Sequence, residues 1–450
     1  MDIEIFDRFL FAFTVGSHIL LVSLSIALAI MICACEFLFA RTKDPFYGGL
    51  VRRLIRPFVV SFGIGTASGI VMAVELVNLF PKFMTLVSST GVIAIFYVEI
   101  FAFFLETIFL VVYIYYGRYF KGNYRRAMLT LPVAGGTLLS AALIVMVNAW
   151  MNTPNGFDLA AYVATGQITG VNPWAPFLTA STGYEMAHVL SAVPLTGLMV
   201  LGGMFAFLYS RSKGADERAL YKRGLRVALT LSFVLVILTI IAGMLQIENL
   251  YKFQPLKYAA IELNAQPGSY LPIVLFGTWN GHGVTGGIVI PGLQSFFTGS
   301  ATLPGLSQFS GLPWPPLYIH TAFDVMAIGG ALLGLFLVVY GGLWAMKRNP
   351  FDKPLLTAVF VVFSIVTPII MELGWMVDEI GRQPWIVYNV LLVANAANYN
   401  TAIIAPGYVI IAAYLVLVPF TFWFMFRTFG SRAVALDVAR GPTGGDDVNY

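Results

Sequence analysis

The chain has 450 residues, of which 58% are hydrophobic and only 11% are charged, and its formal net charge is +4. Soluble domains carry roughly 25% charged residues, so this composition excludes a soluble globular protein, and we expect no nucleic-acid partner. Apolar segments of about 20 residues, the length that crosses the hydrocarbon core of a membrane, recur along the whole chain. They leave no room for a separate soluble domain, so residues 1–450 are expected to form one all-α membrane domain.

Nine membrane-spanning helices are predicted. The first has no basic leader and no small-residue cleavage site, which favours a retained helix over a signal peptide. Cys33 and Cys35, one residue apart within it, cannot form the CxxCH pattern of covalent haem attachment. The predicted spans are about 9–38, 57–80, 91–116, 128–151, 179–210, 227–247, 317–346, 354–378 and 402–426.

Lysine and arginine residues are distributed unevenly between the two sets of span ends. Of the 26, 21 lie at 41–56, 117–126, 211–226, 347–353 and from 427 onward, while the other side holds Arg8, Lys82, Lys252, Lys257 and Arg382. By the positive-inside rule the N-terminus is outside and the C-terminus is cytoplasmic. The connection at 248–316 is then an outside loop, and loops of this length are usually functional or disordered.

Ionisable side chains inside a membrane are costly, so each one is a candidate for function. At a rise of 1.5 Å per residue, His18, His188 and Met326 lie about nine or ten residues from the outer ends of their spans, and Glu379 lies at such an end. Imidazole and thioether groups are common axial ligands of haem iron, although a lone histidine or methionine in a span is more often a packing residue. The ionisable candidates are His18, Glu75, Glu99, Glu106, Glu185, His188, Asp324, Glu372, Asp378 and Glu379.

Two of these carboxylates form a spaced pair. Glu99 and Glu106 are seven residues apart, which places them two turns apart on one face of the third helix, with Glu106 deeper. Such a ladder can relay protons across hydrocarbon. The alternative is that both are permanently protonated and hydrogen-bonded between helices, and Glu75 and Glu185 stay unassigned.

Several strings together resemble one family. The most distinctive is "GWMVDEIGRQPW" at 374–385, and the others, in chain order, are "FDRFLFAFTVGSH", "EIFAFFLE", "VNAWMNTPNGF" and "LKYAAIE". Over about residues 6–395 the chain resembles the haem-bearing subunit I of cytochrome bd-type quinol oxidases, of the type with a short quinol-binding loop. The resemblance implies a terminal quinol:oxygen oxidoreductase of a respiratory chain in a prokaryotic cytoplasmic (inner) membrane.

The resemblance also implies roles for individual residues. His188 and Met326 would be the axial ligands of a low-spin haem b, while His18 and Glu379 would each ligate one haem of a high-spin pair. That pair would be a haem b and either haem d or a third haem b. Further cofactor-binding residues would be Arg8, Arg382, Gln383 and Trp385, the last three beside haem propionates. Lys257 and Glu262 would bind quinol, with Glu262 accepting a proton.

The implied mechanism divides the chain into regions. Quinol would be oxidised at the outside loop 248–316, and O2 would be reduced to water with cytoplasmic protons delivered through the catalytic Glu106 and Glu99. Helices 1–4, residues 1–151, would carry a high-spin ligand and the proton path, residues 179–378 the low-spin haem, and 402–426 the ninth helix. The expected partner is a second membrane subunit, subunit II-like or a subunit I-like paralogue, with small single-span subunits in some members.

Some features depart from the family pattern. The third-helix glutamates are seven apart where eight is expected, and Asp324 stands where the family carries an arginine, which should alter the potential or the propionate partner of the low-spin haem. Asp378 is expected to be a solvated acid at a helix end, or else a proton exit. His282 and His320 are expected to be loop or helix-end residues, either of which could line the quinol pocket.

Two other functions are compatible with parts of this pattern. One is a family member that binds haem and quinol without reducing oxygen. The other is a membrane transporter coupled to protons or cations, which would use the intramembrane acids but gives no reason for histidines near the outer surface.

Overall fold

The computed structural model describes residues 2–120, 124–430 and 434–440. Within these ranges, nine helical segments are long and apolar enough to cross a membrane, and they confirm the predicted number and order of spans. They are α1 (Ile3–Thr42), α2 (Pro45–Leu79), Ile93–Tyr119 formed by α4 (Ile93–Val111), η1 (Val112–Tyr116) and η2 (Gly117–Tyr119), α5 (Arg125–Asn152), α7 (Thr182–Arg211), α8 (Ala215–Phe253), α11 (Ile319–Ala345), α12 (Pro354–Gly381), and Thr401–Gly430 formed by η6 (Thr401–Ile403) and α14 (Ile404–Gly430).

Several helices are longer than their predicted spans. The 39 residues of α8 replace a predicted span of 227–247, and at 1.5 Å per residue they extend about 58 Å, well beyond a hydrocarbon core of about 30 Å. Hydropathy detects only the apolar part of a helix. The backbone hydrogen bonds continue through the polar ends, so the helix ends later than its hydrophobic stretch.

The turn between the first two helices has clear local causes. Lys43 ends α1 in the left-handed conformation, with φ 59°, and its N–H bonds to Phe39. The side chain of Asp44 then accepts a hydrogen bond from the N–H of Phe46, and Pro45 occupies the first turn of α2. These are standard signals for ending one helix and starting the next. They make α1 and α2 an antiparallel pair.

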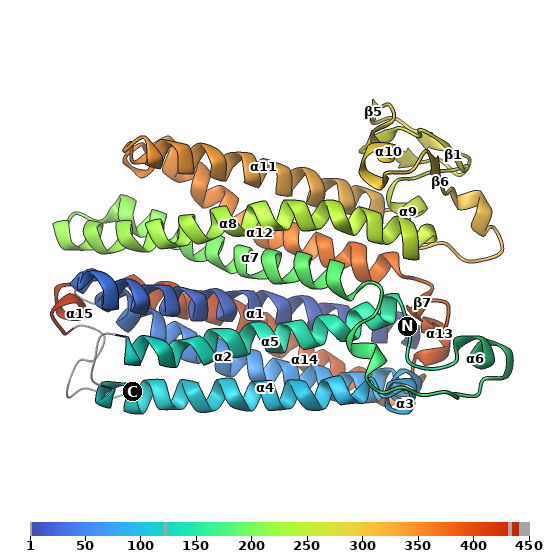
Figure 1. Cartoon of the computed structure of the whole chain (residues 1–450), viewed down its shortest axis with the longest axis horizontal. Coiled ribbons are helices and arrows are strands. Elements are labelled where there is room, and N and C mark those ends of the chain that lie inside the picture. The colour runs from blue at the N-terminus through green and yellow to red at the C-terminus, as the bar shows by residue number, and fades with distance from the viewer. Residues whose placement is uncertain (1, 121–123, 431–433, 441–450) are drawn as a thin grey trace.

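The connection at 248–316, named the outside loop for its predicted side of the membrane, is folded. It contains α9 (Pro255–Ile261), α10 (Leu293–Thr298) and η4 (Leu306–Phe309), and three short antiparallel strand pairs project from one end of the helix bundle (Figure 1). The pairs are β1 (Gly268–Ser269) with β6 (Thr302–Leu303), β2 (Ile273–Leu275) with β5 (Ile288–Ile290), and β3 (Thr278–Trp279) with β4 (Val284–Thr285). Ile273 pairs with Ile290 and Leu275 with Ile288 in the longest of them.

The remaining short elements cap the two ends of the bundle. They are α3 (Pro81–Ser89), α6 (Leu159–Thr165), η3 (Ala175–Phe177), η5 (Pro350–Asp352), β7 (Trp385–Val387) paired with β8 (Leu391–Leu392), α13 (Val393–Ala396) and α15 (Val434–Arg440). The buried pair of Arg53 and Asp437, with Nε and Oδ2 2.7 Å apart, holds α15 against α2.

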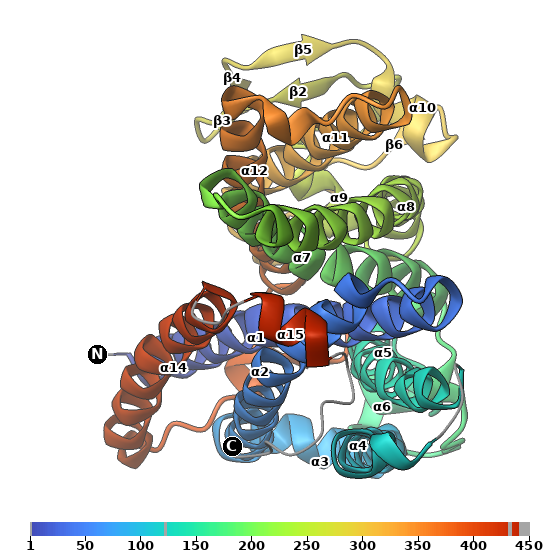
Figure 2. The same ribbon diagram turned by 90° about the vertical axis from the view of Figure 1, so that its left-hand side faces the viewer.

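The spanning helices form two groups of four. α1, α2, α4 and α5 pack together, as do α7, α8, α11 and α12, while α14 lies against α1 and α2 (Figure 2). The groups meet where α1 packs on α7. Gly197 of α7 makes this approach possible, because a Cβ there would lie 2.1 Å from the backbone oxygen of Ser23 and 2.5 Å from the Cβ of Ala27.

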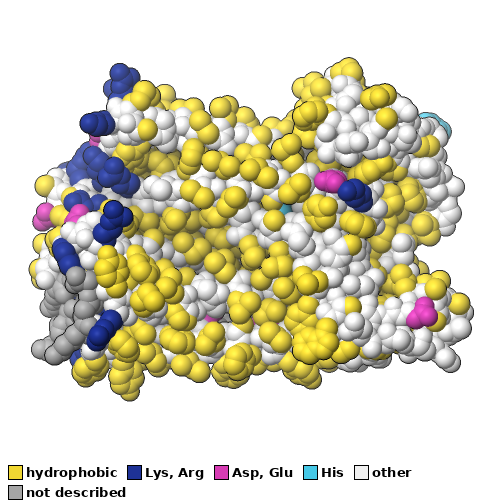
Figure 3. Space-filling model, in the orientation of Figure 1, with side chains coloured by type: hydrophobic (Ala, Val, Ile, Leu, Met, Phe, Trp, Pro, Cys, Tyr) yellow, Lys and Arg dark blue, Asp and Glu magenta, His cyan; other side chains and the backbone are white. Residues whose placement is uncertain are grey.

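The two ends of the bundle differ in charge. Lys and Arg side chains gather at the end opposite the outside loop (Figure 3). The N-terminus lies at the loop end and α15 at the basic end (Figure 1). Two of the basic residues counted in the sequence, Lys121 and Arg432, lie outside the described residues.

Replacing Gly197 by Ala should lower the apparent Tm of the detergent-solubilised protein. The added methyl group forces the two helix groups apart, and overpacking of this kind costs about 1–3 kcal/mol. Differential scanning fluorimetry of the purified protein measures the effect.

The matched control is Gly183→Ala on the same helix, since a Cβ at 183 meets nothing within 4 Å. It should leave the Tm unchanged or raise it slightly, because alanine is the better helix former. Equal effects from both substitutions would contradict the close approach at Gly197.

Candidate functional site

His18 is fixed between the first two helices. Its Nδ1 lies 2.6 Å from the hydroxyl of Ser68, and its Nε2 makes no hydrogen bond within the described chain. Gly69 leaves room beside the ring, since a Cβ there would lie 3.4 Å from Cε1 of His18. One turn before His18, Thr14 of α1 donates a hydrogen bond to Glu75 of α2 at 3.0 Å, which links the same two helices. The ring is therefore oriented through one nitrogen and leaves the other for a ligand.

His188 and Met326 lie in the second helix group. Nδ1 of His188 is buried and has no hydrogen-bond partner. Glycines face both side chains: a Cβ at Gly243 would lie 3.4 Å from His188, and a Cβ at Gly374 would lie 3.6 Å from Cγ of Met326. A buried ring nitrogen without a partner is costly unless something binds it.

The end of α12 carries a dense polar network. Arg382 is 1% exposed and donates from Nη1 to the side-chain oxygens of Asn148 and Asn152, at 2.7 and 2.8 Å, while Nη2 pairs with Glu379. Its Nε has no partner. Asn148 and Asn152 were missed as site residues by sequence reasoning, although two asparagines four apart in a span were a usable signal.

Asp378 belongs to the same network, so the prediction that it is a solvated acid is wrong. Its carboxylate accepts hydrogen bonds from Lys257 at 2.6 Å, from Asn148 at 2.6 Å and from Asn152 at 3.3 Å. Nζ of Lys257, whose side chain is 1% exposed, also donates to the backbone oxygen of Asp378. Asn152 donates further to Glu185 at 2.8 Å. Lys257 thus ties α9 of the outside loop to α12.

Other predicted residues meet at this end of the bundle. Arg8 of α1 donates to the side-chain oxygen of Gln383. Trp385, in β7, packs edge-on against Tyr388 with ring centroids 4.9 Å apart. The "GRQPW" string therefore contacts α1 and α5 as well as its own helix.

Glu99 and Glu106 both face α5, as predicted for residues on one helical face. Ser140 donates to Glu99 at 2.5 Å. Gly136, one turn away, makes room for Glu106, because a Cβ there would lie 2.8 Å from the Cβ of Glu106. Glu106 is buried, and its Oε1 has no partner.

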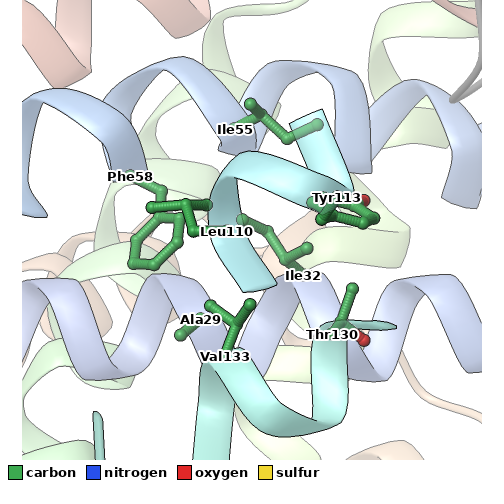
Figure 4. Close-up of a pocket in the computed structure, with 8 residues that line it drawn as sticks. All are labelled: Ala29, Ile32, Ile55, Phe58, Leu110, Tyr113, Thr130 and Val133. Atoms are coloured by element: carbon green, nitrogen blue, oxygen red, sulfur yellow. The ribbon is translucent and has the colours of Figure 1, made fainter. Parts of the chain in front are cut away.

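A small pocket lies beyond Glu99 and Glu106, toward the basic end of the bundle. It lies between α1, α2, α4 and α5, and of its lining residues Tyr113 and Thr130 supply side-chain oxygens (Figure 4). Tyr113 donates to Glu36 at 2.5 Å, and Arg126 pairs with the same carboxylate. Sequence reasoning missed Glu36, although it is a carboxylate within the first predicted span.

A third cluster lies beneath the outside loop. Glu262 follows α9 directly and is buried; this burial, and secondly the nearby charge of Asp324, raise the pKa of Glu262 to about 8. Asp324 accepts the N–H of Phe276 at 2.5 Å, and its Oδ2 lies 3.3 Å from Nε2 of His320. Asp324, which replaces the expected arginine, thus accepts a hydrogen bond from the backbone of the loop.

The donor set fits haem better than a bare metal ion. Within the described ranges, no group of three or more His, Cys, Asp or Glu side chains gathers to hold a metal. Haem iron needs only one or two axial ligands from the protein, because the macrocycle supplies the others. His18, His188, Met326 and Glu379 come from four different helices, α1, α7, α11 and α12. The unpartnered Nε of Arg382 suits propionate binding.

Comparison with known proteins identifies the family. The sequence model of the family described as "Cytochrome bd terminal oxidase subunit I" matches residues 6–433. The chain is 30% identical to a putative cytochrome bd menaquinol oxidase subunit I of Bacillus subtilis, over 90% of this chain and 91% of that one. It is 25% identical to a cytochrome bd ubiquinol oxidase subunit 1 of the same organism, over 91% of each.

A solved structure has the same fold. The bd oxidase from Geobacillus thermodenitrificans superposes with a TM-score of 0.88 at 30% identity, covering 96% of this chain and 99% of that one.

Fold and site together define a multi-pass membrane oxidoreductase with haem cofactors. The chain belongs to the cytochrome bd terminal oxidase subunit I family. It is a quinol oxidase subunit, and cytochrome bd oxidases work with a second subunit.

Removing one partner of the buried Lys257–Asp378 pair should destabilise the protein more than removing both. Asp378→Asn leaves the ammonium of Lys257 without its counter-charge, and breaking a buried pair costs about 3 kcal/mol or more. The Lys257→Met and Asp378→Asn double variant should recover part of this loss.

Thermal unfolding of the two single variants and the double variant forms the test. Additive losses in Tm would show that the two side chains do not interact in the folded protein.

Proposed function

We propose that this chain oxidises quinol beside its outside loop and reduces O2 to water within the bundle, with protons drawn from the basic end. The observation that carries the proposal is the continuous set of contacts from Lys257 of α9 through Asp378 to Asn148, Arg382 and Glu379. It joins the predicted quinol loop to a predicted haem ligand. A transporter has no need of such a connection.

The proposed haem positions are supported by the side chains described above. His188 and Met326 would hold a low-spin haem b, and His18 and Glu379 a high-spin pair composed of a haem b and either haem d or another haem b. The guanidinium groups of Arg8 and Arg382 suit propionates, with Gln383 and Trp385 beside them. When bound, the haems supply electron transfer from quinol and the iron chemistry of O2 reduction.

The charge asymmetry supports an orientation. Lys and Arg side chains gather at the end opposite the loop (Figure 3). By the positive-inside rule this end faces the cytoplasm, so the N-terminus and the loop lie outside. The first four spanning helices then carry the proton path and one high-spin ligand, and residues 179–378 carry the low-spin site.

The quinol site centres on Glu262. Its carboxylate takes a proton from a quinol hydroxyl, a general-base role that requires hydrogen-bond reach. Lys257 contributes by holding α9 against α12 through Asp378, which sets the place of Glu262 at the end of the same short helix. Protons released here leave on the loop side.

Protons for O2 reduction take a separate route. Glu36 and Tyr113 stand nearest the basic end, followed by the pocket lined by Tyr113 and Thr130. Glu106 comes next on the same helix, and then Glu99 with Ser140. Because quinol protons leave on one side and these enter from the other, charge is separated without a pump.

The surroundings of the chain complete the proposal. Large apolar side chains are exposed on α4, α8, α11, α12 and α14, as lipid or subunit contact requires. The partner would be a second membrane subunit, subunit II-like or a subunit I-like paralogue, in a prokaryotic cytoplasmic membrane.

Glu106→Gln should slow quinol-dependent O2 consumption by about 10²-fold or more, because glutamine cannot pass on a proton. The haem absorption spectrum should stay unchanged. Oxygen uptake and optical spectra of the purified complex measure both, with Glu217→Gln at the basic end of α8 as the control. Unchanged turnover would remove Glu106 from the proton path.

The rate of quinol oxidation should rise with pH through about 8. Glu262 accepts a proton only when ionised, and burial raises its pKa to about 8, so the ionised fraction grows as pH increases through that value. In Glu262→Gln the rise of the rate with pH should be absent, and kcat/KM should fall by about 10²-fold or more. Glu248→Gln, which removes a half-buried carboxylate of α8 that pairs with Lys252, should keep the wild-type profile.

A pyridine haemochrome spectrum combined with oxygen uptake tests the function as a whole. Haem together with quinol-dependent oxygen uptake is the expected result. A colourless preparation would support the transporter, and haem with quinol binding but no oxygen uptake would support the second alternative.

A further inference from the structure

Three titratable side chains come together beneath the outside loop. Glu262 lies at the end of α9, and His320 and Asp324 lie one turn apart on the first two turns of α11. Their exposed fractions are 3%, 2% and 2%. The loop segment that carries Phe276 and Gly277 covers them, since Phe276 donates its N–H to Asp324, and a Cβ at Gly277 would lie 3.7 Å from Nε2 of His320.

The tautomer of His320 follows from its backbone contact. Nδ1 lies 2.6 Å from the carbonyl oxygen of Ile261, the residue before Glu262. A carbonyl oxygen only accepts, so Nδ1 carries the hydrogen, and in the neutral ring Nε2 holds the free lone pair. The imidazole is therefore poised to take a proton at Nε2.

Polar atoms in this cluster lack partners. Nε2 of His320 is buried without a hydrogen bond, although it lies 3.3 Å from Oδ2 of Asp324. The carboxylate of Glu262 makes no hydrogen bond with any residue that the structure describes. Buried polar atoms without partners are costly, so the cluster suits a ligand that brings hydroxyl groups of its own.

We propose that Nε2 of His320 is a proton acceptor of the quinol site, with Asp324 as its counter-charge and Glu262 receiving the other proton. This assignment rests on the proposed function. One quinol O–H bond breaks as an N–H bond forms at Nε2, and the second proton goes to Glu262. Two electrons would leave one at a time, because the haem that His188 and Met326 would hold takes up a single electron and would pass it on before receiving the next, and quinone remains.

The charge at position 324 favours this role. Oδ2 of Asp324 lies 3.3 Å from Nε2 of His320, and the N–H of Phe276 holds that carboxylate in place. The acceptor nitrogen therefore faces a carboxylate, where the resemblance to the family would lead one to expect a guanidinium group. Aspartate stands at position 324 in place of the expected arginine, and its ion-pair partner His320 lies one turn earlier on the same helix.

The test is His320→Asn in the purified, haem-loaded complex. Asparagine retains an amide donor for the carbonyl oxygen of Ile261 but cannot take a proton. We expect kcat for quinol oxidation to fall by about 10- to 100-fold with KM little changed. The haem spectrum, and O2 consumption with an artificial electron donor such as ascorbate with tetramethylphenylenediamine, should stay at wild-type levels.

The pH profile separates the two acceptors. The rise through about pH 8 belongs to Glu262 and should persist in His320→Asn. Tyr270→Phe, at an exposed tyrosine of the same loop, is the control and should behave as the wild type.

Three results would overturn the assignment. They are unchanged quinol turnover, a rise in KM with unchanged kcat, and a parallel loss of haem or of artificial-donor oxidation, which would mark His320 as structural. A wild-type complex that binds haem but does not oxidise quinol would overturn the proposed function as well. Wild-type activity that survives His320→Asn overturns only this assignment.

Discussion

The ion pair between the buried Lys257 and Asp378 is the contact on which the loop end of the molecule depends. A lysine that is 1% exposed in a membrane protein is stable only with a counter-charge and further hydrogen bonds, and Asp378 provides both through its carboxylate and its backbone oxygen. The pair fastens the loop at 248–316 to α12. Because Asp378 also bonds to Asn148, the loop, α5 and Arg382 form one rigid unit.

Helix packing complements this polar unit. The two groups of four helices meet at α1 and α7, where Gly197 brings the backbones into direct contact. Close packing through small residues is the usual way for membrane helices to associate, since lipid removes the hydrophobic driving force between them. His18 and His188 lie on these two helices, so their relative placement depends on this close interface.

The two ends of the bundle carry different clusters of polar and titratable side chains. Glu36, Tyr113 and Arg126 lie toward the basic end, whereas Glu262, His320 and Asp324 lie beneath the loop. Glu106 and Glu99 stand between, both turned toward α5. In the proposed function, this arrangement would keep the groups that release protons apart from those that take them up, as charge separation across a membrane requires.

The sequence by itself determined the nine spans, the charge asymmetry and the family, because hydropathy, loop charge and short strings are local properties. From their spacing alone, it also placed Glu99 and Glu106 on one face of the third helix. Tertiary structure decided the partners: Asp378 pairs with a lysine 121 positions away, and Asp324 turns to the loop and to His320. The partners of Asn148, Asn152 and Glu36 are likewise known only from the structure. Such pairings depend on which helix faces which, and that is set by long-range packing that no local pattern encodes.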